Sequence, residues 1–104
     1  MTVMPDSVNI LGHEYTIEYK DNPVDVDRSR RESLWGQIDF WTRTIRIYTG
    51  DKPNSDIWHT LIHEVLHGIS SDLNLVLGKD EHHDDLDVLA LALTDVLFRN
   101  GWMK

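Results

Sequence analysis

The sequence predicts a small α+β protein in which an antiparallel-rich β-sheet packs on a central helix and on a C-terminal helix. Three observations support this prediction. Residues 35–48 alternate apolar and polar side chains, residues 56–71 repeat apolar side chains at helical spacing, and residues 82–99 do so again. A chain of 104 residues is long enough for one compact domain and too short for two. We therefore expect a single domain over residues 1–104.

The first third of the chain predicts a strand pair and a charged connection. Residues 8–19 carry β-type side chains on both sides of a turn at Gly12 and His13. Residues 21–33 are strongly charged and contain Pro23, so they predict a surface loop or a short helix.

Residues 35–48 are typical of a β-hairpin with its turn at residues 41–43. The apolar side chains expected on one face are Ile38, Phe40, Ile45 and Ile47. On the opposite face, Arg43 and Arg46 are expected to be cross-strand partners of Asp39.

The helix predicted over residues 56–71 has two distinct faces at about 100° per residue. The apolar arc holds Ile57, Trp58, Leu61, Ile62, Val65, Leu66 and Ile69. The opposite arc holds Asp56, His59, Thr60, His63, His67 and Ser70. Glu64 falls on the border between the arcs, and Asn54 or Ser55 is the expected N-cap. One face is therefore suited to a core, and the other carries histidines.

Within this helix, His63, Glu64 and His67 have the H-E-x-x-H spacing of zinc hydrolases. Two histidines four residues apart lie one turn from each other, so their imidazoles can converge on one metal ion. The glutamate between them can reach a metal-bound water as general base. The chain has no cysteine, so any metal must be held by histidine, aspartate or glutamate.

The last predicted element is a helix over residues 82–99. Its main apolar stripe holds Leu86, Leu89, Ala90, Leu93, Val96 and Leu97. Val88, Leu91 and Ala92 make much of the remaining surface apolar as well. A helix that is apolar nearly all round is either deeply buried or partly covered by another chain. This pattern allows a homodimer.

A third metal ligand is expected, because catalytic zinc usually takes three protein ligands and one water. The candidates lie in the acidic segment that opens the last helix. Helical phase places His82 near the apolar stripe and His83 with Asp87 along one edge, whereas Asp84 and Asp85 point away. Periodicity does not choose between His82 and His83. The acidic residues also suit a helix N-terminus on electrostatic grounds alone.

Several segments resemble small zincin-like proteins of phages and prophages that are related to the ImmA/IrrE type of metallopeptidase. They are Gly36-Gln37-Ile38-Asp39-Phe40, Thr44-Ile45-Arg46-Ile47, His63-Glu64-Val65-Leu66-His67-Gly68-Ile69, Leu89-Ala90-x-x-Leu93 and Val96-Leu97-x-x-Asn100. The resemblance covers roughly the last two-thirds of the chain, and only the H-E-x-x-H is highly specific. It implies a minimal zincin-like fold, in which a small sheet packs on the zinc helix and the next helix donates the third ligand.

The resemblance also implies a ligand set and an activity. In such proteins the third ligand is usually a glutamate six residues before a Leu-Ala pair, a position that Leu89-Ala90 assigns to His83. The implied site is one Zn²⁺ held by His63, His67 and His83, with Glu64 as the catalytic base. Asp87 would orient His83 or replace it as ligand.

The implied reaction is hydrolysis of peptide bonds in a protein or peptide substrate. The substrate would lie extended along the edge strand of the hairpin at residues 35–48. His59 and Tyr48 are the candidates for stabilising an oxyanion.

Two alternatives to a peptidase stay open. The first is a catalytically inactive zincin-fold protein that binds metal and acts as a protein-interaction module, which the small size and the three-histidine set allow. The second is a metal-free fold in which the motif is accidental.

Composition and charge exclude other classes. The formal charge of −8 at pH 7 argues against non-specific binding of nucleic acid. No apolar run approaches the ~20 residues that span a bilayer, and the N-terminus lacks a secretion signal. We therefore expect no membrane partner and a cytoplasmic location.

Overall fold

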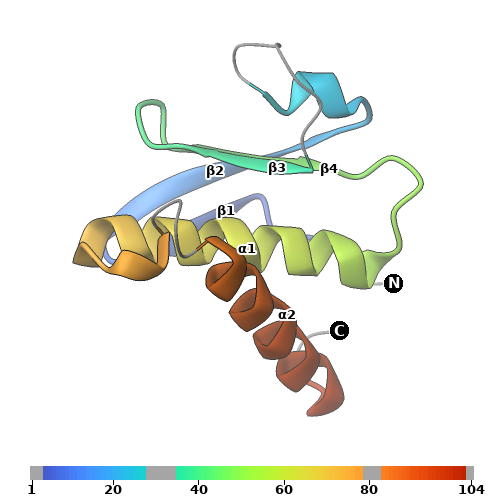
Figure 1. The fold of residues 1–104 in the computed structure, drawn as a ribbon. Helices are drawn as coiled ribbons and strands as arrows, with labels where there is room; N and C mark the ends of the chain where they lie inside the picture. Colours follow the sequence, from blue (N-terminus) through green and yellow to red (C-terminus); the bar gives the residue numbers. More distant parts are fainter. Residues whose placement is uncertain (1–3, 28–34, 79–82, 103–104) are drawn as a thin grey trace.

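A four-stranded mixed sheet and two helices make up the fold (Figure 1). The computed structural model describes residues 4–27, 35–78 and 83–102. In chain order the elements are β1 (Ser7–Ile10), β2 (His13–Lys20), the 3-10 helix η1 (Pro23–Asp25), β3 (Gly36–Asp39), β4 (Thr44–Tyr48), α1 (Asn54–Leu73), the 3-10 helix η2 (Val76–Gly78) and α2 (His83–Arg99). The predicted α+β class is confirmed.

The strand order is β1-β2-β4-β3, so β1 and β3 are the two edges of the sheet. β1 with β2 and β3 with β4 pair antiparallel, as the sequence predicts. β2 and β4 pair parallel, with Ile17 opposite Ile45. This central pairing joins segments far apart in the chain, and no local pattern predicts it.

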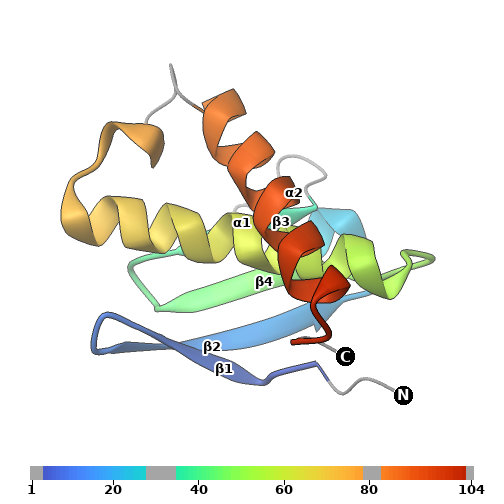
Figure 2. The same ribbon diagram turned by 90° about the horizontal axis from the view of Figure 1, so that it is seen from below.

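The molecule is layered: α1 lies against one face of the sheet, and α2 crosses α1 on the side away from the sheet (Figures 1 and 2). The core lies between the sheet and α1. Its buried residues are Ile10, Tyr15, Ile17, Ile45, Ile47, Ile57 and Leu61. All but one of these seven are aliphatic, and the strand members alternate with outward-facing polar residues.

The β3–β4 hairpin agrees with the prediction except at its turn. Ile38 lies opposite Ile45, but Phe40 is 46% exposed, because β3 ends at Asp39. The Oδ1 atom of Asp39 accepts hydrogen bonds from the next turn's backbone, at 3.0 Å from Trp41 N and 3.3 Å from Thr42 N. The Asp39–Arg46 ion pair is confirmed at 3.7 Å.

Helix α1 is longer than residues 56–71 at both ends. Its N-cap is Pro53, which makes no side-chain cap hydrogen bond, so the prediction of Asn54 or Ser55 is wrong. Proline is extended here and leaves Asn54 to begin the helix. At the other end Asn74 adopts the left-handed conformation, and Leu75 N donates to Ser70 O at 2.9 Å, a pattern that ends helices.

Helix α2 buries only part of the predicted stripe, Leu86 and Ala90, together with Thr94. Leu86, Ala90 and Thr94 are buried, whereas the predicted core residues Leu89, Leu93 and Val96 are 45%, 38% and 45% exposed. The sheet was also predicted to pack on this helix, but α2 packs on α1 along one narrow face and has no sheet on its other side (Figure 2). Among the described residues, no helix is long and apolar enough to cross a membrane.

Candidate functional site

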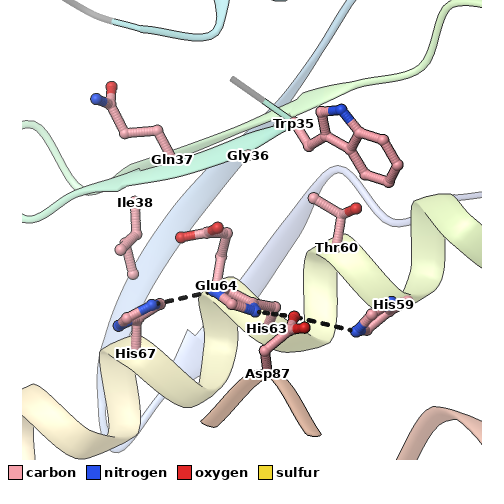
Figure 3. A pocket seen from close by; sticks show the side chains of 10 residues that line it. All are labelled: Trp35, Gly36, Gln37, Ile38, His59, Thr60, His63, Glu64, His67 and Asp87. Carbon is pink, nitrogen blue, oxygen red and sulfur yellow. Dashed lines mark hydrogen bonds and ion pairs between the residues drawn. The ribbon is translucent and has the colours of Figure 1, made fainter. Parts of the chain in front are cut away.

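The histidine-bearing face of α1 lines a pocket of about 510 Å³ beside the edge strand β3 (Figure 3). Its lining residues come from the β3 segment, from α1 and from α2. They are Trp35, Gly36, Gln37, Ile38, His59, Thr60, His63, Glu64, His67 and Asp87. The structure therefore brings three of the four predicted site residues, His63, Glu64 and His67, to one cavity.

The two motif histidines face each other across one helical turn. The Nε2 atoms of His63 and His67 lie 3.1 Å apart. Two nitrogen ligands of a tetrahedral zinc, each at 2.0–2.1 Å from the ion, are separated by roughly 3.3–3.4 Å. This donor pair therefore fits a shared metal ion with only a small adjustment of the rings.

Asp87 of α2 holds the other side of the His63 ring. Its Oδ1 lies 2.9 Å from His63 Nδ1 and 3.4 Å from His59 Nε2 (Figure 3). A carboxylate at Nδ1 favours the tautomer with its proton on that nitrogen, which leaves the Nε2 lone pair toward His67. Sequence reasoning gave Asp87 the role of orienting or replacing His83 and missed this contact with His63.

The third ligand stays a prediction. His83 is the first residue of α2, but its side chain lies outside the described residues, as does all of His82. Within residues 4–27, 35–78 and 83–102, no group of three or more His, Asp or Glu side chains is arranged to hold a metal ion. Asp84 and Asp85 are exposed in the first turn of α2.

Glu64 lies deeper than its place at the border of the helix arcs predicts. It is only 7% exposed and points toward β3 (Figure 3). Burial raises the pKa of Glu64 to about 8, against a smaller opposing effect of a backbone hydrogen bond from Ile38. In the protein without metal, this carboxyl group therefore holds a proton at neutral pH.

The raised pKa makes stability depend on pH. Between pH 4.5 and about 8, the unfolded chain has lost the Glu64 proton and the metal-free native protein keeps it. The free energy of unfolding in EDTA should therefore fall as pH rises through this range, relative to Glu64→Gln. Urea denaturation of both proteins at several pH values measures the difference. If the free energy of unfolding depended on pH in the same way in wild type and in Glu64→Gln, the Glu64 carboxyl would not be buried and protonated.

Gly36 allows β3 to approach α1 closely. A Cβ at this position would lie 2.6 Å from Thr60 Cγ2 and 2.9 Å from Glu64 Oε2. Only a residue without a side chain fits there unless the strand or helix moves.

Gly36→Ala should consequently lower the free energy of unfolding by about 1–3 kcal/mol and displace Glu64. Urea denaturation measures the loss. Adding Thr60→Ser removes the clashing methyl group and keeps the hydroxyl that donates to Asp56 O at 3.0 Å. The double variant should regain part of the stability, and a Gly36→Ala protein as stable as wild type would contradict the close approach.

Of the two residues predicted to stabilise an oxyanion, His59 and Tyr48, only one lines the pocket. His59 lines the pocket, one turn before His63, whereas Tyr48 is not among the lining residues. Sequence reasoning missed Trp35 and Thr60 as lining residues. The spacing of His59, His63 and His67 at successive four-residue steps was the available signal for a continuous histidine face.

No protein-family model, curated protein or solved structure matches this chain. The H-E-x-x-H motif and the geometry of the pocket are therefore the features that point to a function.

Proposed function

We propose that this chain is a zinc-dependent peptidase whose site is the pocket between α1 and β3. The observation that carries the proposal is the 3.1 Å separation of the His63 and His67 Nε2 atoms inside an open pocket that also holds Glu64. His83 is proposed as the third ligand. The Asp87 contact supports the proposal, because histidine ligands usually donate their second ring N–H to a carboxylate or carbonyl.

The proposed chemistry divides between the ion and the protein. Bound zinc supplies a Lewis acid and lowers the pKa of a water ligand to about 7. The charge of a bound zinc would favour the ionised form of Glu64, whose carboxylate would then accept a proton from the attacking water and deliver it to the leaving amine. His59, which lines the pocket one turn before His63, is proposed to stabilise the developing oxyanion.

The edge strand supports an extended peptide as the substrate class. Tyr48 N donates to Trp35 O at 2.8 Å across the hairpin. Because bonded and non-bonded pairs alternate along an antiparallel ladder, Gly36 and Ile38 direct their backbone groups away from β4. The Ile38 N–H already donates to the Glu64 carboxyl. A substrate strand would therefore pair with the remaining outward backbone groups of this edge strand, which borders the pocket.

Cleavage of an unfolded protein tests the proposal. Zinc-loaded protein is incubated with reduced, carboxymethylated protein substrates, and new termini are identified by mass spectrometry. We expect cleavage that 1,10-phenanthroline stops and added zinc restores, and none with His67→Ala. Stoichiometric zinc without cleavage across a broad substrate set would contradict the peptidase.

The rival function is peptide binding without hydrolysis. The same open edge of β3 favours it, since strand addition needs no catalysis. In that case a tight-binding peptide would be recovered intact from the zinc-loaded protein.

A further inference from the structure

The outward side of α2 carries an apolar surface that the proposed function does not use. We call it the α2 strip: Val88, Leu89, Ala92, Leu93 and Val96. Val88 is 64% exposed, and Leu89, Leu93 and Val96 are 45%, 38% and 45% exposed. At about 100° per residue, the strip begins beside the buried stripe at Leu93 and reaches the side opposite the buried Leu86, Ala90 and Thr94 at Val88.

A helix on the outside of a protein normally presents polar residues to water. Here the outward face is apolar over more than two turns, and contiguous apolar surface of this kind marks interaction sites. We therefore expect another protein surface to bind the α2 strip.

The charges at the ends of the strip indicate what that partner is. Asp85, Ala92 and Arg99 are spaced by seven residues, so they share one side of the helix. Asp85 is exposed at the N-terminal end, and the Arg99 side chain is 78% exposed at the C-terminal end. Arg99 pairs within the helix with Asp95 at 2.8 Å and still presents much of its surface to solvent.

An antiparallel copy of the same helix complements this pattern. If two α2 helices cross at Ala92, the Asp85 side chain of each copy meets Arg99 of the other, and the small alanine lets the helices approach. A parallel arrangement would instead set like charges opposite each other. The strip is thus complementary to itself in one orientation.

We propose that α2 mediates an antiparallel homodimer through the α2 strip, with Ala92 at the two-fold axis. Asp87 faces the opposite side of α2, where it contacts His63, so the dimer leaves the pocket open. The proposal is independent of the peptidase function. One helix per chain gives an interface at the small end of the known range, so we expect a Kd in the micromolar range.

Sedimentation equilibrium from micromolar to about 1 mM protein tests the association. The expected mass approaches twice the 12.1 kDa of one chain at high concentration. Leu89→Glu, within the strip, should raise the dissociation constant at least 100-fold. Leu91→Glu makes the same change at a residue that is 57% exposed outside the strip, and it should leave the constant unchanged.

Disulfide trapping tests the orientation, and the absence of native cysteine makes it unambiguous. Asp85→Cys and Arg99→Cys proteins are mixed and oxidised. The antiparallel dimer predicts a mixed disulfide in large excess over both homodisulfides. A wild-type monomer at about 1 mM, equal effects of the two glutamate substitutions, or predominant homodisulfides would each overturn the proposal.

Discussion

Glu64→Gln is expected to lower the rate of peptide hydrolysis by about 10²–10⁴-fold, the usual contribution of a general base, while zinc stays bound. Glutamine has nearly the same shape, so the buried position beneath β3 keeps its packing, but the amide cannot accept the proton from water. Steady-state kinetics and zinc content on the same sample measure the two effects.

Glu14→Gln provides the matched control, because Glu14 is exposed on β2 and does not line the pocket. Its hydrolysis rate should equal that of wild type. If Glu64→Gln keeps full activity, the assignment of the base is wrong. If wild type has no activity and Glu64→Gln leaves peptide binding unchanged, the rival binding function is favoured.

Zinc should stabilise the folded protein strongly. A ligand that binds only the native state at a free concentration of 1,000 times its Kd adds about 4.1 kcal/mol to the free energy of unfolding. For a chain of this length, that gain corresponds to an increase in Tm on the order of 20 °C. Differential scanning calorimetry with and without EDTA measures it.

His67→Ala should remove the zinc-dependent increase, whereas His13→Ala should retain it. His13 is a histidine on β2 that pairs with Asp72 at 4.0 Å and lies outside the pocket lining. Equal Tm values for wild type in zinc and in EDTA would indicate that the H-E-x-x-H spacing is accidental.

The sequence predicted the elements whose signals are local. The two-faced pattern around His63 and the alternation around Ile45 each lie within one segment, so α1 and the β3–β4 hairpin followed directly. The parallel pairing of β2 with β4 joins distant segments, and periodicity holds no information about it.

In the candidate site, too, the contacts within one element were predictable and the contacts between elements were not. The approach of His63 to His67 follows from a spacing of four residues on one helix. The contact of His63 with Asp87 depends on how α2 crosses α1, and the depth of Glu64 depends on Gly36 above it. Likewise, the apolar residues of α2 predict a buried helix. Which of them are buried depends on the face of α2 that packs on α1, and the sequence does not specify that face.

The zinc content of the purified protein decides whether the His63 and His67 imidazoles hold a metal ion. Wild-type protein, purified without a histidine tag and incubated with zinc, is passed through gel filtration and analysed for bound metal beside His63→Ala and His67→Ala. We expect about one zinc per chain in wild type and almost none in either variant. No bound zinc in the wild-type protein would contradict the metal site and, with it, the proposed peptidase.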